Sequence, residues 1–77
     1  MALRLKTPFR AELDALCARH GVDNYKELSK MTGIYYQTLR DRLVNPRMIR
    51  FSEIISICEA LCATEDEVTE LTKTILN

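Results

Sequence analysis

The stretch NYKELSKMTGIYYQTLRDRL, residues 24–43, decides the fold. Asn24 carries a side-chain oxygen that can cap a helix, and Glu27 follows at the three-residue spacing of a capping box. Leu28 and Met31 supply the apolar positions of that helix. These signals predict a helix of about two turns over residues 25–31.

A second short helix follows a tight turn. Gly33 tolerates the positive φ that such a turn requires. Leu39 and Leu43 lie four residues apart, so they predict a helix over residues 36–43 with an apolar inner face and a polar outer face. Two short helices joined by a turn that contains glycine are typical of a helix-turn-helix, which this stretch therefore predicts.

Helix-start and helix-stop residues divide the rest of the chain into further helical units. Thr7 and Pro8 suit the cap and the first turn of a helix that Gly21 ends. Pro46 closes the motif, and Thr64 followed by three acidic residues begins the last helix. The expected helices cover residues 8–20, 25–31, 36–43, 51–62 and 65–76.

The apolar residues of these units predict one core and therefore a single all-α domain over residues 1–77. Hydrophobic residues make up 47% of the chain and charged residues 29%, which excludes disordered and collagen-like chains. The helix over 51–62 carries an apolar stripe of Phe51, Ile54, Ile55, Cys58, Leu61 and Cys62. The expected core is Phe9, Leu13, Leu16, Leu28, Ile34, Leu39, Leu43, Ile54, Ile57 or Cys58, and Leu61.

The motif, followed by a proline-containing loop, an apolar helix and a threonine-capped helix, resembles the lambda repressor and Cro family. The likeness continues through NPRMIRFSEIISICEALCATEDEVTEL, residues 45–71, so it covers most of the chain. That family has a compact five-helix fold in which the helix-turn-helix binds DNA. The resemblance implies a small, phage-type, Cro-like transcriptional regulator. Such a regulator occludes a promoter by binding a double-stranded DNA operator as a dimer.

The resemblance also implies which residues meet DNA, because in this family the second motif helix reads base edges in the major groove. Gln37 is suited to pair with adenine, and Arg40 with guanine. The expected base contacts are Tyr35, Tyr36, Gln37, Arg40 and Asp41. The expected phosphate contacts are Tyr25, Lys26, Arg42, Asn45, Arg47 and Arg50.

The charges are sorted along the chain although they cancel in total. Residues 1–50 carry ten basic and five acidic residues, a net charge of +5, whereas residues 51–77 carry one basic and six acidic residues, a net charge of −5. The basic half suits a polyanion, and the acidic half suits another surface. An alternative function is therefore a modulator or antirepressor on the same fold that binds a partner repressor protein. The expected protein interface, for self-association or for that partner, is Val68, Leu71, Ile75 and Leu76.

Other function classes have little support in the sequence. Cys17 with His20, and Cys58 with Cys62, have spacings that could hold zinc. The position of Cys58 and Cys62 on an apolar stripe, and of His20 at a helix end, favours structural roles over a metal site. One histidine and the absence of known catalytic motifs argue against an enzyme, a cofactor or a small-molecule substrate. Three cysteines and no long apolar segment predict a cytoplasmic protein that does not enter a membrane.

Overall fold

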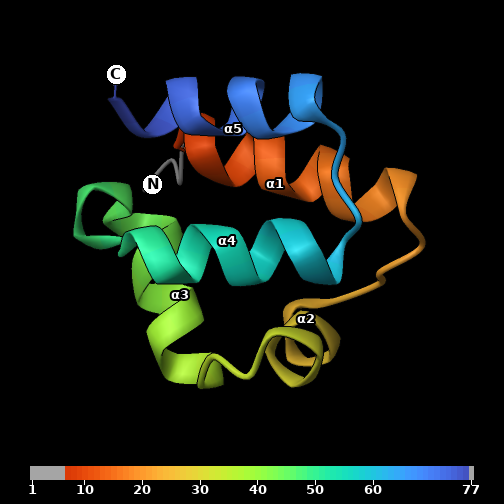
Figure 1. Cartoon of the computed structure of the whole chain (residues 1–77). Helices are drawn as coiled ribbons and strands as arrows, with labels where there is room; N and C mark the ends of the chain where they lie inside the picture. Colours follow the sequence, from red (N-terminus) through yellow and green to blue (C-terminus); the bar gives the residue numbers. More distant parts are fainter. Residues whose placement is uncertain (1–6, 77) are drawn as a thin grey trace, which may run out of the picture.

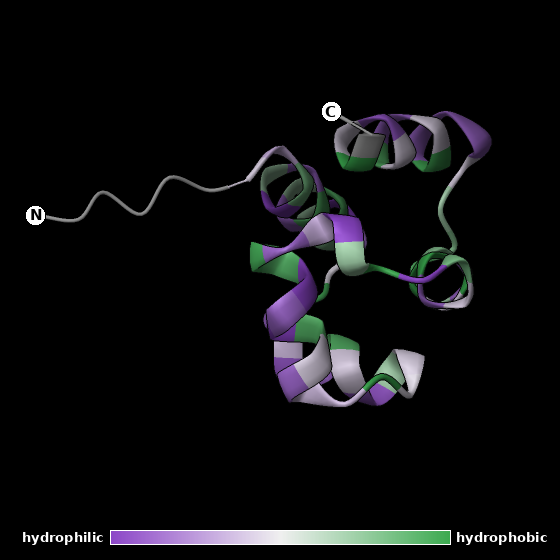
Figure 2. Cartoon of the chain, turned by 90° about the vertical axis from the view of Figure 1, so that its left-hand side faces the viewer, coloured by the Kyte–Doolittle hydropathy of each residue, from purple (hydrophilic) through white to green (hydrophobic). Residues whose placement is uncertain are grey.

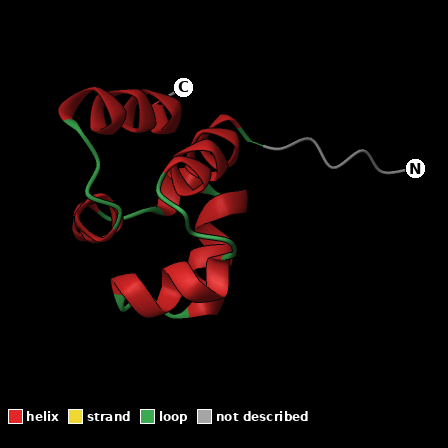
Figure 3. Cartoon of the chain, turned by 90° about the vertical axis from the view of Figure 1, so that its right-hand side faces the viewer, coloured by secondary structure: helices red, strands yellow, loops and turns green. Residues whose placement is uncertain are grey.

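The structure is a computed structural model that describes residues 7–76, with the side chains of residues 7–75. Within this range the chain forms helices and connecting turns without a strand (Figure 3). In chain order the elements are α1 (Pro8–Arg19), α2 (Tyr25–Thr32), α3 (Tyr36–Val44), the 3₁₀ helix η1 (Pro46–Met48), α4 (Phe51–Ala60) and α5 (Glu65–Leu76). The five-helix prediction is confirmed, and η1 is an addition that the sequence did not indicate.

Side-chain caps begin three of these helices. Thr7 Oγ1 accepts a hydrogen bond of 3.1 Å from the N–H three residues further on, and Asn24 Oδ1 accepts the equivalent bond of 2.8 Å. Thr64 and Glu67 bond each other's backbone N–H groups at 2.9 and 3.2 Å, which is a capping box. Because each cap joins residues within one turn, the starts of these helices could be predicted from local sequence.

The helices pack together compactly, and the helix-turn-helix formed by α2 and α3 lies at one side (Figure 1). α5 lies along α1 in the antiparallel sense, and α4 runs across the middle and packs on α2. α3 contacts both α2 and η1. The hydroxyl of Thr7 also donates a 2.9 Å hydrogen bond to the carbonyl oxygen of Leu43, so the start of α1 is joined to the end of α3.

The core contains most of the residues that the helical stripes predicted, with three additions and two corrections. Cys17, Val22 and Leu71 are also buried. The N–H of Val22 donates to the carbonyl of Cys17 at 2.9 Å, which folds the segment after α1 back onto the core. Ile34 and Ile54 are only half-buried, so their placement in the core interior was wrong. The buried residues are Phe9, Leu13, Leu16, Cys17, Val22, Leu28, Leu39, Leu43, Ile57, Leu61 and Leu71.

The apolar stripe of α4 is also corrected. Phe51 at the start of the helix is 77% exposed, and Ile55 one turn later is exposed as well. Ile57 and Leu61 are the residues that enter the core, and the helix packs through that side onto α2. Phe51 and Ile55 therefore present apolar side chains to solvent, while Cys58 of the same stripe packs against the core.

Candidate nucleic-acid interface

The turn between α2 and α3 is held by hydrogen bonds on both sides of Gly33. This glycine has a φ of 77°, and its N–H donates to the carbonyl of Ser29 at 2.9 Å. The Ser29 hydroxyl donates to the carbonyl of Ile34, whose N–H in turn donates to Thr32 Oγ1 at 3.2 Å. The hydroxyl of Ser29 therefore ties α2 to the turn that leads into α3.

α3 presents a polar outer side while its inner side is anchored. Leu39 and Leu43 are buried, whereas Gln37, Arg40 and Asp41 are exposed. Tyr35, the residue that precedes the helix, is 84% exposed and provides no side-chain cap. An exposed polar face on a rigidly anchored helix is the arrangement that a helix needs to enter the major groove.

Tyr36, unlike the exposed Tyr35, is half-buried, and two cations lie near its ring. The Lys26 ammonium lies 5.9 Å from the centroid of the Tyr36 ring, and the Arg40 guanidinium lies 5.8 Å from it. Both distances fit cation–π contacts. The ring therefore brings together one cation from the start of α2 and one from the exposed side of α3.

The connection from α3 to α4 carries further polar and basic residues. Asn45, Arg47 and Arg50 are all exposed. Figure 2 shows this side of the molecule, where hydrophilic and hydrophobic residues alternate along the connection. The connection is held by hydrogen bonds of its own backbone, at 3.0 Å from Met48 N–H to the carbonyl of Asn45 and at 3.1 Å from Ile49 N–H to that of Pro46.

Comparison with known proteins agrees with this geometry. A family model described as a Cro/C1-type HTH DNA-binding domain matches residues 12–74, which is most of the chain. The chain belongs to the Cro/C1-type family. No curated protein and no solved structure matches it. The family assignment makes the chain a helix-turn-helix DNA-binding regulator domain. No helix in the described part of this domain is long and apolar enough to span a membrane.

Arg42 points into the fold of this Cro/C1-type domain, although it was expected to contact DNA phosphate. Its Nε donates to Glu53 Oε1 at 3.0 Å and its Nη1 lies 2.8 Å from Asp41 Oδ2, and only 15% of its side chain is exposed. Burial acts to raise the pKa of Glu53, but hydrogen bonds from the Arg50 N–H and from Arg42 outweigh it and lower that pKa. Because its guanidinium holds α3 to α4, Arg42 is not one of the phosphate contacts that we propose for this domain.

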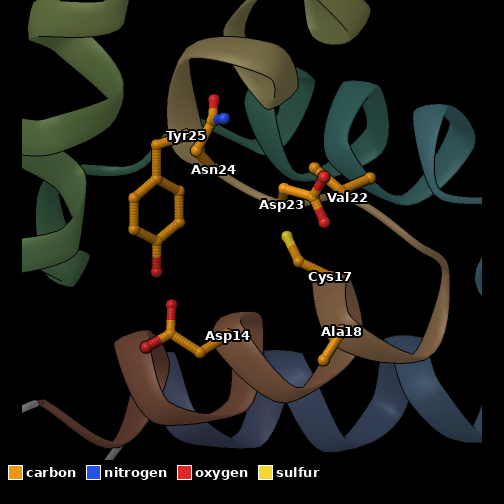
Figure 4. A pocket seen from close by; sticks show the side chains of 7 residues that line it. All are labelled: Asp14, Cys17, Ala18, Val22, Asp23, Asn24 and Tyr25. Carbon is orange, nitrogen blue, oxygen red and sulfur yellow. The ribbon is translucent and has the colours of Figure 1, made fainter.

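The side chain of Tyr25 is also turned inward. Its ring packs against the core, and its hydroxyl is buried without a hydrogen-bond partner among the described residues. Figure 4 shows the hydroxyl pointing into a pocket toward the side chain of Asp14 on α1, away from the outer side of the motif. The side chain of Tyr25 therefore acts in packing, and the exposed cation at the start of α2 is Lys26.

The expected protein interface on α5 also changes. Leu71 is fully buried and belongs to the core, so it is removed from the interface. Val68 and Ile75 are half-buried, and the side chain of Leu76 lies outside the described part of the structure. The large exposed apolar side chains lie elsewhere in the Cro/C1-type domain, with Val44 66% and Met48 62% exposed. The sequence reading missed this pair because neither residue belongs to a long helical stripe.

Two of the three cysteines and the single histidine have structural roles. Burial raises the pKa of the Cys17 thiol to about 11 and also raises that of Cys58, so both thiols are protonated and packed. His20 Nε2 lies 3.1 Å from Glu67 Oε1, which also belongs to the capping box of α5. Among the described residues no three metal-ligand side chains come together.

Proposed function

We propose that this chain is a transcriptional regulator that binds a double-stranded operator sequence-specifically and occludes a promoter as a dimer. One observation carries the proposal: the exposed side of α3 carries Gln37 and Arg40 beside a set of exposed basic residues. In the proposed complex α3 enters the major groove, where Gln37 pairs with adenine and Arg40 with guanine. Tyr35 and Asp41 flank these two residues, and Tyr36 holds Arg40 toward the bases.

The phosphate contacts of the proposed complex come from both ends of the motif. Lys26 lies at the start of α2, where the helix N-terminus also favours an anion. Asn45, Arg47 and Arg50 lie on the connection to α4 and follow the backbone on the other side. Phosphate contacts of this kind orient the protein on the duplex and give most of its affinity, but they carry little sequence information.

The test is a selection from randomised 30-base-pair duplexes, followed by titration of the recovered duplex at two salt concentrations. A dimer that neutralises about 6–10 phosphates loses roughly 10³- to 10⁵-fold in affinity between 50 and 200 mM salt. Replacing Gln37 by Ala is expected to cost about 1–3 kcal/mol at one base pair only. Replacing Arg47 by Ala is expected to weaken all duplexes alike and to reduce the salt dependence.

A second function is favoured by the charge on α5. Glu65, Asp66 and Glu70 are exposed on this helix, so its outer side suits a basic protein surface. The chain would then be a modulator that binds a partner repressor through α5. Failure to bind any duplex at 50 mM salt, together with loss of repressor binding when the three acids are replaced by Lys, would favour this function over operator binding.

A further inference from the structure

We infer that Thr7 is a positioning residue for DNA reading, because its hydroxyl sets the angle between α1 and α3. The inference rests on the proposed operator binding and assigns part of it to a residue outside the helix-turn-helix. Thr7 Oγ1 donates a 2.9 Å hydrogen bond to the carbonyl oxygen of Leu43, across 36 positions of the sequence. The sequence predicted Thr7 only as the cap of α1, so this contact is a product of the tertiary fold.

The bond supplies a partner to a carbonyl at the end of α3. The last carbonyls of a helix have no intrahelical N–H to accept from. The N–H of Asn45 closes the final turn on the carbonyl of Asp41 at 2.8 Å, and the Thr7 hydroxyl bonds the carbonyl of Leu43 further along. The Leu43 side chain is buried and the bond itself is partly buried. Loss of the donor would therefore leave a carbonyl that water replaces poorly.

Thr7 can hold α3 in place because it is itself held at the start of α1. Its Oγ1 accepts a 3.1 Å hydrogen bond from the N–H of Arg10, and its carbonyl accepts one of 3.0 Å from the N–H of Ala11. Phe9, two residues further on, is fully buried in the core. One hydroxyl therefore caps α1 and connects the end of α3 to an anchored turn.

A small change of angle at this end of α3 matters for base contacts. The Arg42–Glu53 pair still ties α3 to α4 when the Thr7 bond is lost, but one of the two ties is gone. Gln37 lies six residues before Leu43, so a tilt of about 10° would move it by about 1.6 Å at a rise of about 1.5 Å per residue. Hydrogen bonds to bases hold only between about 2.7 and 3.2 Å. Phosphate contacts carry little sequence information and depend less on this angle.

The test compares Thr7→Val with Thr64→Val. Each change removes a hydroxyl that caps a helix and keeps the shape of the side chain, but only Thr7 also bonds α3. For each protein, the Kd of a scrambled duplex is divided by the Kd of the selected duplex at the same salt concentration. We expect Thr7→Val to lower this ratio about five- to tenfold, mainly through weaker binding of the selected duplex. Thr64→Val is expected to keep the wild-type ratio, since lost stability alone weakens both duplexes equally.

Two further variants keep the comparison decisive. Thr7→Ser retains the hydroxyl, so it is expected to restore the wild-type ratio. Thr7→Asp retains an acceptor that caps α1 but has no proton to donate at pH 7, so it replaces Thr7→Val if circular dichroism shows that the valine variant does not fold. Its added charge acts on both duplexes and therefore cancels in the ratio.

A second measurement does not depend on DNA. Residual dipolar couplings of the backbone N–H groups give the angle between α1 and α3 in solution. We expect Thr7→Val to change this angle by more than Thr64→Val does, and Thr7→Ser to keep it. An angle that Thr7→Val leaves unchanged, or a ratio that Thr64→Val lowers equally, would overturn the inference. A wild type that selects no duplex would instead overturn the proposed function, while the angle still decides whether Thr7 positions α3.

Discussion

Arg42 of α3 and Glu53 of α4 form an ion pair in which 15% and 14% of the two side chains are exposed. The same Glu53 oxygen that accepts the Arg42 Nε–H at 3.0 Å also accepts the backbone N–H of Arg50 at 2.8 Å. One carboxylate therefore fixes the first turn of α4 and the direction of α3. It also holds both ends of the connection that carries the proposed phosphate contacts. Charge-assisted hydrogen bonds such as these are stronger and shorter than neutral ones.

Loss of this pair is expected to weaken DNA binding although neither residue is proposed to touch DNA. Replacing Glu53 by Gln removes the charge that faces the Arg42 Nε–H and leaves the exposed Asp41 carboxylate as the charged partner of Arg42, so α3 and the connection are held less firmly. We expect the Kd for the selected duplex to rise about 3- to 30-fold. Glu59→Gln removes the same charge from an exposed position of α4 and serves as control. If the two variants bind alike, the pair does not position the interface.

The ring of Tyr36 is expected to affect sequence preference through Arg40. Each cation–π contact contributes about 0.5–1 kcal/mol at an exposed site. Tyr36→Leu removes the ring and is expected to reduce the preference for guanine at one position by about two- to fivefold. Tyr36→Phe keeps the ring and serves as the matched variant. Competition between duplexes that differ at that base pair measures the effect, and equal losses in both variants would assign the role to the hydroxyl instead.

The burial of Leu71 predicts a role in stability. Replacing Leu71 by Ala leaves a cavity in the core and is expected to lower the free energy of unfolding by about 2–5 kcal/mol. Val68→Ala, on the half-buried part of the same helix, is expected to cost less. Urea denaturation of the three proteins gives the comparison. A Leu71→Ala protein as stable as the wild type but altered in mass would return Leu71 to the interface.

The ion pairs of Glu67 predict how stability depends on pH. A hydrogen bond from the Thr64 N–H, followed by one with His20, lowers the pKa of Glu67 from 4.5 to about 2. A carboxyl whose pKa is lower in the folded state stabilises the fold above its unfolded pKa, and this contribution is lost as the pH falls through the folded pKa.

We therefore expect Glu67→Gln to lower the melting temperature at pH 7. The difference from the wild type should shrink below about pH 4.5 and disappear near pH 2. Glu65→Gln, which removes the same charge from an exposed position in the same turn, is the matched control. A difference between wild type and Glu67→Gln that is constant from pH 7 to pH 2 would contradict the prediction.

Local sequence was sufficient for the helices and for the motif. Asn24 caps α2 through a bond to a residue only three positions away, and Gly33 ends α2 through its own backbone conformation. The buried pair Leu39 and Leu43 follows from spacing within one helix. Interactions within a few residues of one another are encoded directly in the order of residues, so the helix-turn-helix could be predicted before any packing was known.

Tertiary packing decided which side chains of each helix face the core, and this is where the sequence reading failed. Leu71 and Phe51 both belong to apolar stripes, yet α1 covers α5 on the side of Leu71 while the start of α4 leaves Phe51 in solvent. From the sequence Arg42 is expected to contact DNA phosphate, but in the fold its guanidinium is paired with Glu53, eleven residues away. The sequence shows which side chains are apolar enough to be buried and which are charged and can form an ion pair. Whether a given side chain is buried or paired depends on the helix that packs beside it.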